Sequence, residues 1–160
     1  KKEKAPSYLV DEAISIMTHL NKGATESMNS IGVHACTDIT GYGLLGHLLE
    51  ICQASKVSAT LEFNETPLIQ GAYELAQKGF VPGGTKRNMD YVSSHVNFSK
   101  TISKEQQYLL ADAQTSGGLL ISVANDKAKD LQNLLNKNEC LTSSIIGNIY
   151  NQAELPIYVN

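Results

Sequence analysis

The chain has 160 residues, of which 42% are hydrophobic, so it can bury a full core, and one domain is the default. Its net charge of -3 is small and its lysines are scattered, which predicts no nucleic-acid partner. No apolar run is long enough for a bilayer and no signal-peptide core is visible, so we expect no membrane partner and a cytoplasmic location.

Helical and strand-like segments alternate in the first half of the chain. Apolar side chains at helical spacing predict a helix over 9–20, and a shorter helical stretch covers 26–30. A strand-like segment follows over 33–39. Leucines at helical spacing then predict a helix over 44–51. Alternation of apolar and polar residues over 57–63 predicts a strand with one face in water.

In the second half, Pro67 predicts the start of a helix that Gly79 ends. Residues 81–85 are a loop by composition, and 85–104 form the least regular part of the chain. Residues 151–154 predict a hairpin turn between the last two strands. The remaining elements are a strand over 119–124, a helix over 127–135, and strands over 144–150 and 155–159. These elements, with antiparallel strands at the end, predict an α+β fold, a layered sandwich of a mixed β-sheet with helices.

The most informative stretch is 33–47, where a strand meets three glycines and then a helix. Gly41, Gly43 and Gly46 fall at the expected helix N-terminus. Unpaired backbone N–H groups and the helix dipole favour an anion there, and glycine permits close approach. Asp38 does not suit an anion site unless a cation bridges it to the anion. We therefore expect phosphate and a hard metal ion to meet at Asp38.

Other interpretations of this stretch compete with the cation site. Gly41 to Gly46 matches a dinucleotide fingerprint, but we reject it because the preceding strand is too polar for a Rossmann first strand. Alternatively, the turn packs tightly and binds nothing. His34, Cys36 and Asp38 share one strand face and are conceivable soft-metal ligands, although a buried Cys and a hydrogen-bonded His explain the same pattern. The three cysteines lack CxxC spacing, which argues against disulfides and structural zinc.

A second polar cluster lies at 112–118. Gln114, Thr115 and Ser116 bring amide and hydroxyl groups directly before paired glycines. Such a composition suits either the wall of a polar pocket or a tight, buried turn. We weigh the two interpretations evenly.

Three motifs in order carry a family resemblance. Residues 35–47, 82–88 and 112–120 closely resemble motifs in the carboxy-terminal half of selenophosphate synthetase, also known as selenide, water dikinase. The resemblance covers essentially the whole chain. It implies the carboxy-terminal domain shared with aminoimidazole ribonucleotide synthetase, thiamine-monophosphate kinase and a hydrogenase maturation factor. We therefore expect 1–160 to be a single domain, the carboxy-terminal half of a longer two-domain enzyme, and the start at Lys1 rather than Met fits that expectation.

The resemblance implies a reaction in which ATP, selenide and water yield selenophosphate, AMP and phosphate. Mg²⁺ ions bridge the nucleotide phosphates to several aspartates, one of which maps onto Asp38. This agrees with the cation expected there from the residues alone. The wall that faces ATP is expected to include six further residues: Thr40, Gly41, Gly43, Thr115, Gly117 and Gly118.

The family's catalytic lysine, its reactive cysteine or selenocysteine and its other magnesium ligands belong to the amino-terminal half. We therefore expect no catalytic residue in this chain and no activity from it alone. Cys36 is not expected to replace the missing nucleophile, because no base other than His34 lies near it in the sequence. The expected partners are the amino-terminal half of the same enzyme, ATP and selenide, and the parent is expected to be a homodimer.

Two rival classes of function stay open. A stand-alone anion-binding or structural domain would keep its glycines for packing and would not need Asp38. Another ATP-dependent enzyme of the same superfamily, of the thiamine-monophosphate kinase or aminoimidazole ribonucleotide synthetase type, would keep Asp38 and bind a different acceptor.

Overall fold

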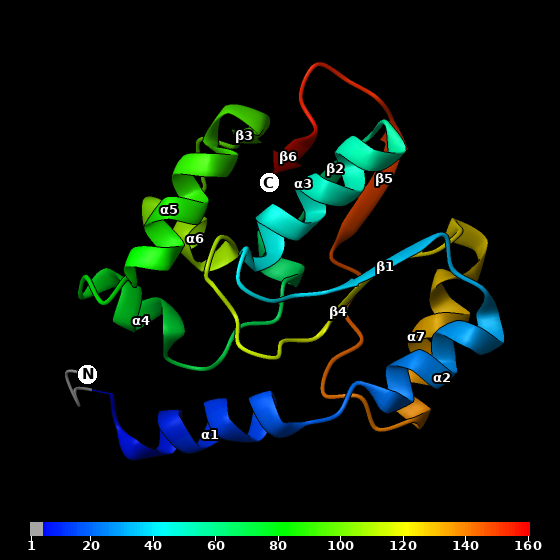
Figure 1. Ribbon diagram of the computed structural model, residues 1–160, viewed down its shortest axis with the longest axis horizontal. Helices are drawn as coiled ribbons and strands as arrows, with labels where there is room; N and C mark the ends of the chain where they lie inside the picture. The colour runs from blue at the N-terminus through cyan, green and yellow to red at the C-terminus, as the bar shows by residue number, and fades with distance from the viewer. Residues whose placement is uncertain (1–4) are drawn as a thin grey trace.

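The computed structural model of the chain describes residues 5–160. The larger of its two sheets has four strands (Figure 1). The strand order is β3 (Val96–Phe98), β6 (Ile157–Val159), β2 (Val57–Leu61) and β5 (Gly147–Asn151). Strand β6 runs parallel to β3 and β2, whereas β5 runs antiparallel to β2. The sheet is therefore mixed, and the predicted α+β layered fold is confirmed.

The main hydrophobic core lies between this sheet and three helices, α3 (Gly43–Ser55), α5 (Gly83–Val92) and α6 (Lys104–Leu110). Helix α3 is buried along most of its length, as expected for a helix whose apolar residues surround its axis. The short helix α4 (Ala72–Gln77) packs against α6. This core holds α3, and with it the glycine turn at the amino end of α3, in one position.

A smaller layer forms around a separate two-stranded ribbon, so the strands do not all join one sheet. Strands β1 (Ala35–Asp38) and β4 (Leu119–Ser122) pair antiparallel, and Asp38 lies opposite Leu119. Helices α2 (Lys22–Ile31) and α7 (Ala128–Lys137) pack against this ribbon (Figure 1). A second apolar cluster lies between them, consisting of Ala24, Met28, Leu131 and Leu135 with side chains of the ribbon.

Two expectations about helices are wrong. The helix predicted from Pro67 begins only at Ala72, after Gly71 with its left-handed φ of 82°. Residues 83–92, predicted as loop and irregular chain, form helix α5, and 93–95 add a short 3-10 turn before β3. Two glycines in the first turn of α5 lower its helix propensity, so its sequence pattern is that of a loop.

The predicted hairpin between the last two strands is also wrong. Strands β5 and β6 run in opposite directions as expected, but β2 lies between them. Ser58 of β2, predicted to face water, is fully buried. Its hydroxyl accepts from the Ala153 N–H at 2.9 Å and donates to the Leu155 carbonyl at 2.9 Å. These two bonds hold the connection from β5 to β6 across the end of β2.

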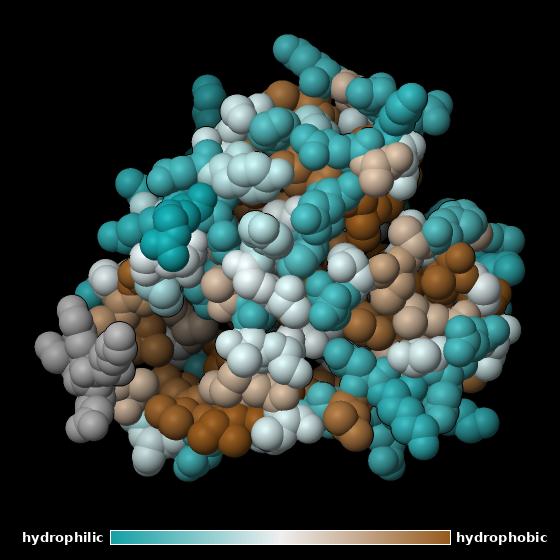
Figure 2. Space-filling model, viewed as in Figure 1, coloured by the Kyte–Doolittle hydropathy of each residue, from teal (hydrophilic) through white to brown (hydrophobic). Residues whose placement is uncertain are grey.

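Helix α1 (Ser7–Thr18) lies along the edge of the molecule, and Leu9 is its only buried residue (Figure 1). Apolar side chains cover much of its surface and gather as a brown patch in Figure 2. The exposed ones in and just beyond the helix are Tyr8, Val10, Ile14, Met17 and Leu20. Among residues 5–160, no helix combines the length and apolar character that crossing a membrane requires.

Candidate functional site

Backbone hydrogen bonds join the two glycine-containing segments that the sequence singles out. The Ile39 N–H donates to the Gly118 carbonyl at 2.9 Å, and the Gly117 N–H donates to the Ile39 carbonyl at 3.1 Å. Beyond them, the Gln114 N–H donates to the Thr40 carbonyl at 2.9 Å. The strand-to-helix turn and the 112–118 loop therefore lie side by side, although some 75 positions separate them in the chain.

Helix α5 brings the third motif to the same place. The Asn88 side-chain amide donates to the Gly41 carbonyl at 2.8 Å and to the Ala111 carbonyl at 3.1 Å. The buried Thr85 hydroxyl donates to the Asp112 carboxylate. The three motifs that carry the family resemblance thus meet in one region of the molecule.

Asp112 carries the most perturbed carboxyl group of this region. Burial raises its pKa, although hydrogen bonds from Thr85 and from the Ala113 backbone act in the opposite direction. The Gln114 amide also approaches Asp112, at 3.4 Å from Oδ2. Asp112 and Thr85 both lie in motifs noted in the sequence, but their contact could not be predicted, because it depends on a helix that was expected to be loop.

Asp38 is the last residue of β1, and its side chain is exposed. His34 and Cys36 share its exposed face, as the alternation predicted. However, no three His, Cys, Asp or Glu side chains within residues 5–160 lie close enough to hold a metal ion together. The soft-metal alternative therefore finds no support. Although Cys36 is exposed as a residue, partial burial of its thiol and the neighbouring Asp38 charge raise the thiol pKa, which disfavours a nucleophilic thiolate.

The predicted site glycines divide into two kinds. A Cβ on Gly43 would lie 2.7 Å from the Ala111 carbonyl group, and Gly43 also has a left-handed φ of 69°. A Cβ on Gly117 would lie 2.5 Å from the Ile39 oxygen. These two glycines are explained by packing. Gly41 and Gly118 have no atom within 4 Å of a Cβ position, so packing does not explain them and their backbone is open to close approach by a ligand.

The middle of the 112–118 loop points outward. Thr115 and Ser116 are exposed, and Ser116 has a left-handed φ of 54°, which is uncommon for a residue with a side chain. This geometry does not match the buried-turn interpretation of these two residues. Their part in a pocket wall stays a prediction.

The sequence did not reveal one polar contact of this turn. The Thr40 hydroxyl lies 3.1 Å from His47 Nε2, and His47 Nδ1 lies 3.0 Å from the Glu50 carboxylate. His47 lies among the leucines of α3, so the apolar pattern of the helix gave no indication of a polar contact there. The only local signal is the spacing of three positions between His47 and Glu50, which places both on one helix face.

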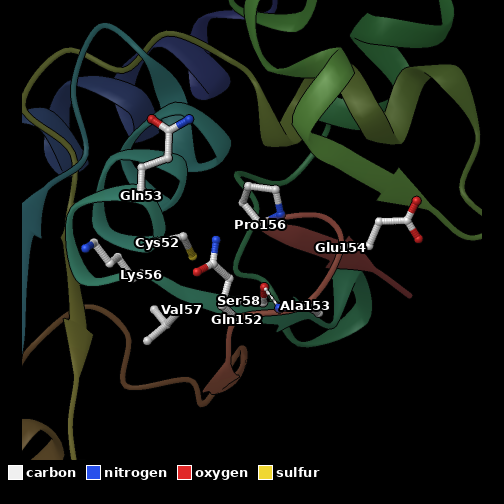
Figure 3. A pocket seen from close by; sticks show the side chains of 9 residues that line it. All are labelled: Cys52, Gln53, Lys56, Val57, Ser58, Gln152, Ala153, Glu154 and Pro156. Carbon is white, nitrogen blue, oxygen red and sulfur yellow. Dashed lines mark hydrogen bonds between the residues drawn. The ribbon is translucent and has the colours of Figure 1, made fainter.

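A separate hollow of about 230 Å³ lies at the other end of α3 (Figure 3). Helix α3 has 13 residues, so roughly 20 Å separates this hollow from the glycine turn. Burial raises the pKa of Cys52, which lines the hollow, to about 11. The Ser58 hydroxyl beside the hollow already bonds to two backbone groups, the Ala153 N–H, drawn as a dashed line in Figure 3, and the Leu155 carbonyl. We assign this hollow no part in the chemistry.

Comparison with known proteins identifies the family. Residues 2–160 match the family described as AIR synthase related protein, C-terminal domain. The chain belongs to this family. As a member of the AIR synthase related family, it also resembles the selenide, water dikinases, which confirms the resemblance found in its three motifs.

Two relatives match along almost the whole chain. The selenide, water dikinase of Caldanaerobacter subterraneus subsp. tengcongensis is 45% identical over 159 residues, which are 99% of this chain and 46% of the relative. The selenide, water dikinase of Clostridioides difficile is 43% identical over 159 residues, which are again 99% of this chain and 46% of the relative. The selenide, water dikinase of Myxococcus xanthus is 48% identical over 125 residues, covering 77% of this chain and 36% of the relative. The chain thus spans about half the length of these relatives.

Proposed function

We propose that the chain is the carboxy-terminal domain of a selenide, water dikinase, a two-domain enzyme that makes selenophosphate, AMP and phosphate from ATP, selenide and water. The observation that carries this proposal is the convergence of the motifs at 35–47, 82–88 and 112–120 in one region, through hydrogen bonds between all three. Similarity to selenide, water dikinases along almost the whole chain supports it.

In this proposal Asp38 is a Mg²⁺ ligand at an active site shared with the amino-terminal half. Its carboxylate is exposed and has no hydrogen-bond or ion-pair partner within residues 5–160, so it is free to bind a cation. Carboxylate oxygen is a ligand that Mg²⁺ prefers. One carboxylate does not complete a metal site, so the other ligands must come from the amino-terminal half, from water or from phosphate. When bound, Mg²⁺ would neutralise charge on the nucleotide phosphates.

The other residues proposed for this wall lie around Asp38. Gly41 and Gly118 leave open backbone on the turn and on the loop, and the Thr115 side chain of the same loop is exposed. Thr40, Gly43 and Gly117 hold the turn and the loop together through their backbone groups. We therefore propose approach of ATP to the open members and a positioning role for the packed ones.

The exposed face of α1 supports the presence of a second domain. Leu20 is 77% exposed, and Ile14 lines an apolar groove of about 290 Å³ together with Ile69 and Leu75. We assign this face to the amino-terminal half, because the relatives are about twice as long as the chain. Backbone amide exchange in α1 should therefore be slower in the full-length parent than in the 160-residue chain. The homodimer expected of the parent stays a prediction.

An assay of the full-length parent with ATP and selenide tests the proposed function, with products identified by phosphorus NMR. Selenophosphate and AMP are expected. Absence of both products, with ADP formed only when a small-molecule acceptor replaces selenide, would instead favour a small-molecule kinase of the same superfamily. The 160-residue chain serves as the control and should produce no AMP, because the proposed catalytic groups lie in the other half. Selenide-dependent AMP from the short chain would contradict the half-enzyme proposal.

A further inference from the structure

A chain of three hydrogen-bonding side chains leads from the surface of α3 into the candidate site. Glu50 Oε2 lies 3.0 Å from His47 Nδ1, and His47 Nε2 lies 3.1 Å from Thr40 Oγ1. His47 is only 7% exposed, whereas the Glu50 side chain is 54% exposed. The Tyr42 ring packs edge-on against the imidazole at 5.7 Å between centroids. The imidazole is therefore enclosed, with a partner at each nitrogen.

The chemistry of these groups sets the direction of both hydrogen bonds. An ionised carboxylate can only accept, so the proton between His47 and Glu50 belongs to Nδ1. The other nitrogen of a neutral imidazole is then an acceptor, so Nε2 accepts a hydrogen bond from the Thr40 hydroxyl. Two lone pairs remain on Thr40 Oγ1, and no other residue in the described part of the chain uses them.

The Thr40 backbone is held as firmly as its hydroxyl. Its carbonyl accepts from the Gly43 N–H at 3.0 Å and from the Gln114 N–H at 2.9 Å. The residue thus stands where the turn, α3 and the 112–118 loop join, two positions beyond Asp38. Because the Thr40 hydroxyl already donates its hydrogen bond to His47, it can only accept from, or coordinate, a ligand.

We propose that His47 is a positioning residue that, held by Glu50 as the Nδ1–H tautomer, fixes the Thr40 hydroxyl as an acceptor two residues along the chain from Asp38. Such a hydroxyl cannot donate to a phosphate oxygen. It suits a hard cation, or water bound to that cation, because both seek oxygen lone pairs. Thr40 therefore serves the cation rather than the nucleotide phosphate. The presence of a cation at Asp38 rests on the proposed function, whereas the tautomer of neutral His47 follows from the chain's own contacts.

Nitrogen-15 NMR of the histidine-labelled 160-residue chain near pH 7.5 tests the tautomer. Two-bond and three-bond ring correlations should show neutral His47 with its proton on Nδ1, and the His47→Gln variant identifies the signal by its loss. In Glu50→Ala the proton should move largely to Nε2, the tautomer that free imidazole side chains favour. Glu50 is half-exposed, so this variant should fold. A protonated imidazolium or an Nε2–H tautomer in the wild type would overturn the proposal.

Mn²⁺ binding to the full-length parent, followed by electron paramagnetic resonance without nucleotide, tests the ligand class. Thr40→Ser keeps the hydroxyl and should bind Mn²⁺ as the wild type does, whereas Thr40→Val should bind it about three- to tenfold more weakly, the effect of one hydrogen bond. Inorganic phosphate should bind all three proteins equally. Weaker phosphate binding with unchanged Mn²⁺ binding would assign Thr40 to the anion and overturn the proposal.

The same measurements separate this inference from the proposed function. If Asp38→Asn leaves Mn²⁺ affinity unchanged, the proposed Mg²⁺ site is wrong at Asp38. The NMR result on His47 is unaffected by that outcome, because it reports only on the contacts among Thr40, His47 and Glu50. Equal Mn²⁺ affinity of the wild type, Thr40→Ser and Thr40→Val would overturn the role of Thr40 even where Asp38 binds the metal.

Discussion

Replacing Gly117 by alanine should destabilise the fold, although the change adds only one methyl group. The new Cβ would lie 2.5 Å from the Ile39 carbonyl oxygen and 3.3 Å from the Gln114 Cβ. Ordinary contact distances are about 3.4 Å or more, so loop and strand must separate by nearly 1 Å. That displacement breaks the Gly117–Ile39 and Ile39–Gly118 hydrogen bonds, which are 3.1 and 2.9 Å long.

The magnitude follows from these losses. Two backbone hydrogen bonds contribute about 0.5–1.5 kcal/mol each, and residual crowding costs about 1 kcal/mol or more. The lower entropy of the unfolded alanine variant returns about 0.4–1 kcal/mol. We expect a net loss of about 2–3 kcal/mol in the free energy of unfolding. For a chain of this size, this corresponds to a melting temperature lower by roughly 5–10 °C.

Gly118→Ala is the matched control, because no atom lies within 4 Å of its Cβ position. Its melting temperature should equal that of the wild type or exceed it slightly. Both variants are measured by differential scanning calorimetry of the 160-residue chain. If Gly117→Ala melts within about 1 °C of the wild type, the close contact between Gly117 and Ile39 is not as described.

Three further predictions concern the site. In the full-length parent, Asp38→Asn should lower magnesium-dependent turnover by orders of magnitude without lowering the melting temperature, and near-normal activity would exclude a ligand role. Thr115→Val should leave the melting temperature unchanged because Thr115 is exposed, whereas a pocket role requires a fall in turnover. Asp112→Asn should have a higher melting temperature than the wild type at about pH 8. At that pH Asp112 is ionised, and its raised pKa in the folded state means that the charge lowers the stability of the fold; asparagine carries no charge. The difference in melting temperature should shrink as pH falls through the raised pKa toward the ordinary value of 3.8, because the folded wild type then takes up a proton on Asp112. A difference that does not depend on pH would contradict the raised pKa of Asp112.

The glycine turn and the 112–118 loop could be singled out from local pattern, but the structural reason for each glycine could not. Asp38 could be noted in the sequence, because a carboxylate directly before a glycine-rich helix N-terminus does not suit an anion site without a cation. Whether a glycine is needed for packing depends on atoms far along the chain, such as the Ala111 backbone beside Gly43. Sequence spacing contains no information about that contact, so Gly41 and Gly43 were indistinguishable.

Helix α5 was missed for a related reason. Its inward-facing positions include Thr85 and Asn88, which make polar contacts to Asp112 and Gly41 rather than apolar ones. A helix that presents polar groups to a site lacks the apolar periodicity from which helices are predicted. The layered fold class, by contrast, was predicted correctly, because apolar segments such as 44–51 and 57–61 are long and regular.

The pairing of the last strands shows the limit of local rules. A short polar connection between two strands favours a hairpin, since neighbours in sequence usually pair. Here the buried Ser58 hydroxyl holds residues 153 and 155, and β2 already occupies the place between β5 and β6. Nothing within residues 147–159 indicates that a strand formed almost a hundred positions earlier will separate them.

The central position of β6 has a consequence for synthesis on the ribosome. Strand β6 lies between β3 and β2, and its Ile157 and Val159 side chains are almost completely buried. Both neighbouring strands leave the exit tunnel long before it does, and β2 is about 100 residues ahead. The sheet therefore stays open at its centre until residue 159 emerges. Pairing of β6 with β2 must then close a very long loop. A nascent chain stalled before that point would expose the apolar edges of β2 and β3 and depend on chaperones.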